Sequence, residues 1–180
     1  MAYFPDLTEY TYLEYFARPL TVNVGWLDTG RPFEAEWPSE DFLNCLWHRC
    51  KFRVAQTRGL HECPFCPQGI DSNYHERNEE AQLLGSFEIR VFGEKGTIYA
   101  APSTIFHYVD IHGYKPPFEF VRAIYESPSP PCSEYFRRLR EIDLECREAS
   151  PLLDRPKRTS RNGEVVLLRL PTRQIHTGAR

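Results

Sequence analysis

The sequence of 180 residues lacks both a long apolar segment and an export leader. No run of about 18 apolar residues occurs, which is what a membrane-spanning helix requires. The opening residues, MAYFPDLTEYTYLEYF, place acidic and aromatic side chains where a signal peptide has basic residues followed by an apolar run. We therefore expect a protein of the cytoplasm that makes no contact with a membrane.

Recognisable catalytic motifs are also missing. A phosphate-binding loop, a nucleophile elbow and a pair of catalytic carboxylates each have a sequence signature, and none of these signatures is present. Internal repeats and heptads are absent as well. The sequence therefore leaves open whether the protein is an enzyme.

Aromatic and apolar side chains are abundant. Hydrophobic residues make up 41% of the sequence and aromatic residues 14%. A chain of this length can remove about 70% of its unfolded surface from water when it folds. We expect a folded globule, and the 15 prolines and 10 glycines predict many loops.

Charge is distributed unevenly along the chain. Residues 1–136 hold 11 basic and 19 acidic residues, a net charge of −8, whereas residues 137–180 hold 11 basic and 6 acidic residues, a net charge of +5. This asymmetry indicates either a basic arm for an acidic partner or nucleic acid, or a tail that folds back onto its own acidic body. The acids interspersed as far as Asp154 favour the second interpretation.

Hydrophobic periodicity predicts an α+β fold, in which helices pack on one side of a small antiparallel sheet. Ser39 is the expected N-cap of an aromatic helix whose buried stripe runs from Phe42 to Cys50. The other predicted elements are strands at 8–16, 20–27 and 165–170, a hairpin of 83–92 with 97–101, an exposed loop at 68–80, and helices at 103–112, 118–125 and 133–149.

A set of metal-ligand residue types is the most informative pattern. Cys63 and Cys66 form a C-x2-C pair, and His107 and His112 form an H-x4-H pair on the helix that follows the predicted hairpin. Two thiolates and two imidazoles can complete the tetrahedral shell of Zn²⁺. The C-x2-C turn is followed by the predicted hairpin and then by the helix. This is the order of a ββα-like zinc site, with an insertion after the C-x2-C turn. We predict one zinc ion bound by Cys63, Cys66, His107 and His112.

Other assignments of these residues stay open. A redox role for the C-x2-C pair would need a strand that leads into a helix at Cys66, and no such context is predicted. His61 could replace His112 as the fourth ligand, act outside the metal shell as a catalytic or ligand-binding group, or be an inert surface residue. Three further histidines are interpreted as incidental and four further cysteines as plain thiols: His48, His75 and His176, and Cys45, Cys50, Cys132 and Cys146.

Two motifs resemble an uncharacterised bacterial protein family, a domain of unknown function. One is R-G-x-H-x-C-x2-C, which begins at Arg58, and the other is A-P-x2-I-x-H-Y-V-x2-H-x-Y-x-P-P-x-E-F, which begins at Ala101. The aromatic opening and the segment G-W-L-D from Gly25 are similar as well. The resemblance extends from residue 3 to residue 125 and implies no established activity.

The prolines of 127–131 predict a stiff junction between two parts of the chain. The first part, 1–127, is the predicted zinc-containing domain, and the second part, 128–180, is a helix with a basic tail. We expect the apolar face of this helix to be buried on the first part and residues 154–163 to stay exposed. That face consists of Tyr135, Phe136, Leu139 and Ile142.

Taken with the absence of catalytic motifs, these features favour a zinc-stabilised, non-enzymatic protein that binds a macromolecular partner. Aromatic and acidic side chains can anchor a basic protein, so a protein partner is expected, and neutralisation of a bacterial toxin or another role in defence is one hypothesis. Nucleic acid is a weaker candidate because the body is acidic. The alternative is a metal-dependent nuclease of the ββα-metal type, with His61 and Glu62 acting on water and with Arg58 and Arg90 supplying positive charge.

Overall fold

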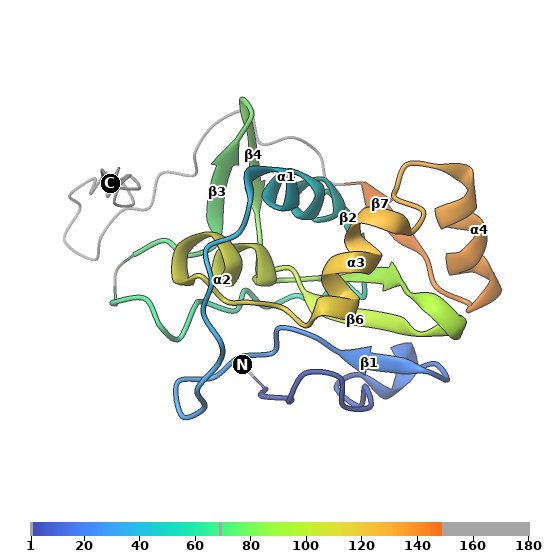
Figure 1. Cartoon of the computed structure of the whole chain (residues 1–180), viewed down its shortest axis with the longest axis horizontal. Coiled ribbons are helices and arrows are strands. Elements are labelled where there is room, and N and C mark those ends of the chain that lie inside the picture. The colour runs from blue at the N-terminus through green and yellow to red at the C-terminus, as the bar shows by residue number, and fades with distance from the viewer. Residues whose placement is uncertain (1, 69, 149–180) are drawn as a thin grey trace, which may run out of the picture.

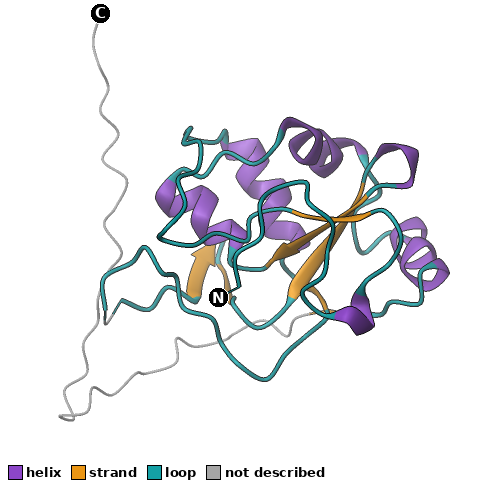
Figure 2. Ribbon diagram, turned by 90° about the horizontal axis from the view of Figure 1, so that it is seen from below, coloured by secondary structure: helices purple, strands orange, loops and turns teal. Residues whose placement is uncertain are grey.

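The computed structural model describes residues 2–68 and 70–148 (Figure 1). Loops account for much of this part of the chain, in agreement with the many prolines and glycines (Figure 2). The elements are, in chain order, η1 (Glu14–Phe16), β1 (Thr21–Asn23), α1 (Glu40–Arg49), β2 (Phe52–Val54), β3 (Tyr74–Arg77), β4 (Glu80–Leu83), β5 (Glu88–Phe92), η2 (Glu94–Gly96), β6 (Ile98–Pro102), α2 (Ile105–His112), α3 (Phe118–Glu126), α4 (Ser133–Glu141) and β7 (Cys146–Glu148).

A five-stranded sheet with the order β1-β6-β5-β2-β7 forms the centre of the fold. β5 and β6 form the predicted hairpin, in which Val91 lies opposite Tyr99. β2 is antiparallel to both β5 and β7, whereas β1 runs parallel to β6. A long connection separates β1 from β6, so no tight turn forces the two strands to be antiparallel. The α+β class is confirmed, and the sheet is mixed rather than wholly antiparallel.

Both faces of the β5–β6 hairpin are covered. Because side chains alternate along a strand, Ile89 and Val91 face one way and Phe92 the other. Ile89 and Val91 belong to the main core cluster, to which α1, α2 and α3 contribute. Phe92 and Ile98 belong to a second cluster that includes residues of α4. The fourth helix therefore covers the opposite face, apart from the other three helices and beside β7 (Figure 1).

Helix α1 forms as its sequence predicts. The Ser39 hydroxyl accepts a hydrogen bond from the Phe42 backbone N–H, and two acidic residues follow at the positive end of the helix. Arg49, near the other end, is buried and donates from Nη2 to the carbonyl oxygens of Ile124 at 3.0 Å and Ser127 at 3.1 Å. It thereby fastens α1 to the end of α3. The expected apolar stripe is buried in full: Phe42, Leu43, Leu46, Trp47 and Cys50.

Two predictions for the first half of the chain are wrong. Residues 8–16 do not form a strand, since this segment contains only an isolated bridge from Glu9 to Val22 and then η1. Residues 68–80 are not an exposed loop, since they contain β3 and the buried residues Ser72, Asn73 and His75. β3 pairs with β4 in a separate two-stranded sheet. The turn between them consists of Asn78 and Glu79, both at positive φ, which is the two-residue type I′ pattern.

The C-terminal helix is shorter than expected. α4 ends at Glu141, because Asp143 adopts a left-handed conformation and the chain then enters β7, which pairs with β2. Its apolar face is docked as predicted, with Tyr135 and Leu139 each 1% exposed. The division at residue 127 stays a prediction, and the segments 154–163 and 165–170 lie outside the described residues. Within residues 2–68 and 70–148, no helix is long and apolar enough to cross a membrane.

Candidate metal centre

The two cysteines lie in a loop whose entry is held by hydrogen bonds to Ser72, Asn73 and Gly85. The backbone N–H of Cys63 donates to Ser72 Oγ at 2.8 Å, and the N–H of His61 donates to the Gly85 carbonyl at 2.9 Å. The Asn73 side chain donates to the His61 carbonyl at 2.7 Å. Gly85 is required here, because its φ is +100° and a Cβ would lie 2.3 Å from Asn73 Nδ2. These bonds fix the entry to the C-x2-C turn.

Phe65, between the two cysteines, holds the turn against the helical side of the core. Its ring packs edge-on against the rings of Phe33 at 5.4 Å and Tyr108 at 5.8 Å, and it lies 5.5 Å from the ring of His112. Its backbone N–H points at Cys63 Sγ at 3.4 Å, as in a turn that cradles a thiolate. Aromatic contacts thus position the turn beside α2.

Helix α2 supplies both histidines. It follows directly on the hairpin strand β6 and ends at His112, where Gly113 adopts the left-handed conformation with φ 66°. His107 lies within the helix and is completely buried, whereas His112 is its last residue and is partly exposed. The two rings lie 5.0 Å apart between centroids.

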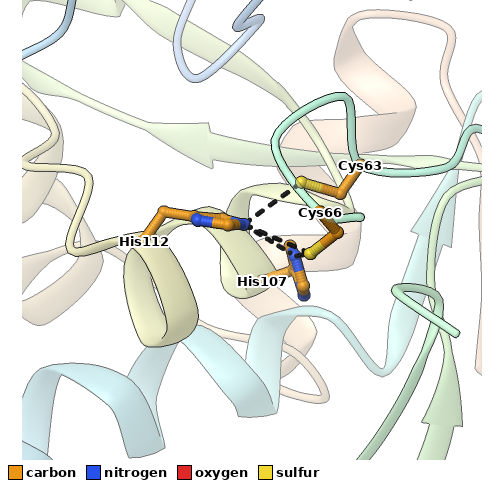
Figure 3. Close-up of side chains that lie close together, drawn as sticks. All are labelled: Cys63, Cys66, His107 and His112. Carbon is orange, nitrogen blue, oxygen red and sulfur yellow. Dashed lines mark hydrogen bonds between the residues drawn. The ribbon is translucent and has the colours of Figure 1, made fainter. Parts of the chain in front are cut away.

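The four predicted ligands converge on one point (Figure 3). His107 Nε2 lies 3.2 Å from Cys66 Sγ and 3.2 Å from His112 Nε2. His112 Nε2 lies 3.2 Å from Cys63 Sγ and 3.5 Å from Cys66 Sγ. All four ligand atoms lie within 4.8 Å of one another.

These separations match a tetrahedral shell. With Zn–S bonds of about 2.3 Å and Zn–N bonds of about 2.0–2.1 Å, tetrahedral geometry places two nitrogens about 3.3 Å apart and a sulfur about 3.5 Å from a nitrogen. The measured values of 3.2 Å and 3.2–3.5 Å agree with this arrangement. The four residues could therefore hold a metal ion.

Burial keeps all four groups in their uncharged forms. It lowers the pKa of His107 to about 2, so the imidazole is neutral and its lone pair is available. Burial raises the pKa of Cys66 to about 12 and that of Cys63 in the same direction. Both groups are therefore thiols when no cation is bound, and a bound metal would replace their protons.

His75 lies beside the four proposed ligands, a position that the sequence interpretation did not predict. It is buried on β3, and its Nε2 lies 3.2 Å from Nδ1 of His107, the ring nitrogen that does not face the cysteines. The same Nε2 lies 3.1 Å from the Ser72 carbonyl oxygen. The interpretation of His75 as incidental stays untested, although this position gives it a possible part in the metal centre. The strand signal around it was weak, because the turn at 78–79 lacks the glycine that usually marks a type I′ hairpin.

His61 lies outside this group of four. Its Nε2 is 3.4 Å from the Tyr12 hydroxyl, on a small depression that also includes Trp26 and Glu88. His48 lies elsewhere, with its Nε2 2.6 Å from the Pro130 carbonyl oxygen, and His176 is outside the described residues. The role of His61 as an alternative fourth ligand stays a hypothesis, although four donors are already present without it.

Comparison with known proteins gives a family without an assigned activity. Residues 2–125 match the family described as Domain of unknown function (DUF7919). The chain belongs to this family. The match includes both motifs that carry the four ligands and ends within α3, before the linker and α4. No curated protein and no solved structure matches the chain.

Proposed function

We propose that this member of the DUF7919 family uses one structural zinc ion to build a surface that binds a protein partner in the cytoplasm. The observation that carries the metal part is the closed set of four donors. Four protein ligands leave no position for a metal-bound water, which is the arrangement of structural rather than catalytic zinc. Two cysteines with two histidines is also a donor set that zinc favours. The centre would therefore stabilise the fold and catalyse nothing.

The metal centre is connected to a groove on the neighbouring surface. Phe33, which packs on Phe65 of the C-x2-C turn, also packs edge-on against Tyr114 at 5.7 Å. Phe33 and Tyr114 line a groove of about 540 Å³ together with Tyr3, Phe4 and Phe118. A bound zinc ion would hold Phe65, and Phe65 in turn supports the groove wall.

The groove has the character of a protein-binding surface. Phe118 at its edge is 73% exposed, and Trp37, close to Gly113 at the end of α2, is 63% exposed. Aromatic side chains of this kind supply most of the binding energy at protein interfaces. The net charge of −8 over residues 1–136 favours a partner with basic residues. A toxin to be neutralised is one partner class that fits this description.

Metal content tests the first part of the proposal. Purified protein should contain about one zinc per chain by elemental analysis, and Cys63→Ser should lose it. Cys45→Ser is the matched control, because Cys45 lies on α1 outside the group of four and should leave the zinc content unchanged. A protein that folds with no bound metal would contradict the proposal.

Capture of partners from the native host tests the second part. Phe118→Asp should reduce the capture of a specific protein, whereas Tyr15→Asp should not, because Tyr15 is 80% exposed but does not line the groove. Both substitutions lie at exposed positions and should change stability by less than about 0.5 kcal/mol. Equal capture by the two variants would remove the groove from the proposal.

The alternative hypothesis, a metal-dependent nuclease, has a direct test. Full-length protein is incubated with DNA and with RNA in the presence of Mg²⁺ or Mn²⁺, and His61→Ala is compared with it. Of the two arginines assigned to phosphate, Arg90 is buried and paired with Glu88 at 2.6 Å, which removes it from a substrate surface. Cleavage that disappears in His61→Ala would replace the binding proposal by the enzyme.

A further inference from the structure

A second cleft lies at the other end of the sheet, where β2 pairs with β7. Its volume is about 740 Å³, and it contains none of the four metal ligands. This size is within the range of about 300–1,000 Å³ that small-molecule sites occupy. Three arginines line it, namely Arg53 of β2, Arg58 of the following loop and Arg147 of β7.

Two of these arginines face each other directly. Arg53 and Arg147 are partners in the antiparallel β2–β7 register, so their side chains leave the sheet on the same face. Like charges placed opposite each other on neighbouring strands destabilise the pair. In the part of the chain that the structure describes, none of the three arginines forms a salt bridge. Among the residues that the structure describes, Glu145 is the one acidic residue that lines the cleft.

Arg53 is held in place and incompletely satisfied. Its guanidinium stacks over the Phe87 ring, 5.0 Å from the centroid, which fixes the direction of the side chain. Its Nε is buried and has no hydrogen-bond partner. Because this nitrogen is not accessible from the cleft, an anion there would bind the outer nitrogens of the guanidinium group, which carry most of its N–H donors.

Apart from Glu145, the remaining lining is uncharged, and it combines apolar residues with the polar Gln56, Thr57 and Ser86. Phe16, Leu60 and Leu83 line the cleft beside the arginines. An occupant therefore meets positive charge on one side and apolar side chains on the other. Guanidinium groups bind phosphate with paired N–H donors, and they are preferred over lysine where this geometry matters. One carboxylate against three guanidinium groups leaves a net charge of +2, which a dianionic phosphate monoester would balance.

We propose that the cleft between β2 and β7 binds a small molecule that carries a phosphate monoester on an apolar or aromatic body. Arg53, Arg58 and Arg147 bind the phosphate, and Phe16, Leu60 and Leu83 contact the body. The cleft shares no lining residue with the four proposed zinc ligands or with the aromatic groove.

Calorimetric titration of the full-length, metal-loaded protein at low salt tests this assignment. Inorganic phosphate is the first probe and adenosine 5′-monophosphate the second. We expect one site per chain, tighter for the nucleotide because it also reaches the apolar wall. Arg58→Gln and Arg147→Gln should each weaken binding about tenfold or more, as expected for the loss of a hydrogen bond to a charged group. Arg140→Gln is the control, since Arg140 is exposed on α4 and does not line the cleft.

Glu145→Gln separates binding from damage to the fold. Removal of the one carboxylate that lines the cleft should tighten phosphate binding, and a misfolded variant would not do so. Absence of binding by both probes at 10 mM, or equal affinity in the Arg58→Gln and Arg140→Gln variants, would overturn the proposal. Binding of an RNA oligonucleotide through the same arginines, without binding of either small probe, would overturn it in favour of a nucleic-acid surface.

Discussion

His75 Nε2 lies 3.2 Å from His107 Nδ1, and His107 presents its other ring nitrogen to Cys66. When a metal occupies Nε2 of His107, the proton of the neutral ring resides on Nδ1 and needs an acceptor. Burial lowers the pKa of His75 to about 4, so His75 is neutral at physiological pH. Its Nε2 also lies 3.1 Å from the Ser72 carbonyl oxygen, so it can accept the hydrogen bond from His107 only in the tautomer that does not donate to Ser72. We expect that tautomer when a metal is bound, and His75 would then fix the tautomer and the orientation of the proposed ligand His107.

Replacement of His75 by Phe should weaken metal binding without abolishing it. Loss of the hydrogen bond made by the ring nitrogen that does not bind the metal reduces metal affinity by about 10–100-fold. The measurement is competition with a chelator of known affinity, on protein that is first shown to be folded. His48→Phe is the matched control, because His48 contacts the Pro130 carbonyl and not the proposed ligands. An affinity unchanged in His75→Phe would show that His75 is only a packing residue.

The four proposed ligands could be found from the sequence because cysteine and histidine at these spacings have few other uses together. Spacing alone could not identify His75. Its part in the site depends on β3, which brings it beside Phe106 and His107 from a segment that looks like a polar loop. The segment folds as a hairpin in which Asn78 and Glu79 adopt positive φ. Glycine is the usual residue at the second of these positions, so a glutamate there does not predict a turn.

Loss of one thiolate should destabilise the whole protein. Structural zinc sites bind with about 10–16 kcal/mol in isolated peptides, and this free energy is coupled to folding, so Cys63→Ser should reduce the free energy of unfolding by several kcal/mol. Urea denaturation measures the change, with Cys45→Ser as control. Treatment of the wild type with a strong chelator should have the same effect. A chelator-treated protein that unfolds at the same urea concentration as the untreated protein would contradict a structural metal.

The helices were predictable where the hydrophobic periodicity and the capping or helix-breaking residues indicate the same boundaries. Ser39, Gly113 and the prolines before Phe118 mark helix ends by local chemistry, and α1, α2 and α3 begin or end there. β1 and β7 were not predictable in their pairing. β7 follows Asp143, which adopts a left-handed conformation, and the hydrophobic periodicity of 133–149 does not predict this break. The pairing of β1 with β6 depends on tertiary contacts between segments that are far apart in the sequence.

The raised pKa of Asp6 predicts that the free energy of unfolding depends on pH. Its carboxylate accepts hydrogen bonds from the Tyr114 hydroxyl at 2.7 Å and the Gly25 N–H at 2.8 Å, yet burial raises its pKa above the usual value. A carboxyl whose pKa is higher in the folded state contributes most below its unfolded pKa of about 3.9, and this contribution is lost as pH rises through the folded value. Asp6→Asn removes this titration.

The difference in unfolding free energy between wild type and Asp6→Asn should therefore shift as pH rises from 3.5 to 7. The wild type should lose stability relative to the variant over this interval. Urea denaturation of both proteins at several pH values measures the difference, which cancels other titrating groups that they share. A shift in the opposite direction would mean that the two hydrogen bonds outweigh burial at Asp6.

Leu139 tests whether α4 belongs to the folded core. This side chain is 1% exposed and packs in the cluster that contains Phe92 and Ile98 from the central hairpin. Leu139→Ala should lower the free energy of unfolding by about 2–5 kcal/mol, the usual result for a buried leucine. Arg140→Ala, one residue further along on the exposed side, should change it by less than about 0.5 kcal/mol. If the two variants unfold alike in urea, α4 is detached in solution, and its apolar face becomes the better candidate for the surface that binds a partner.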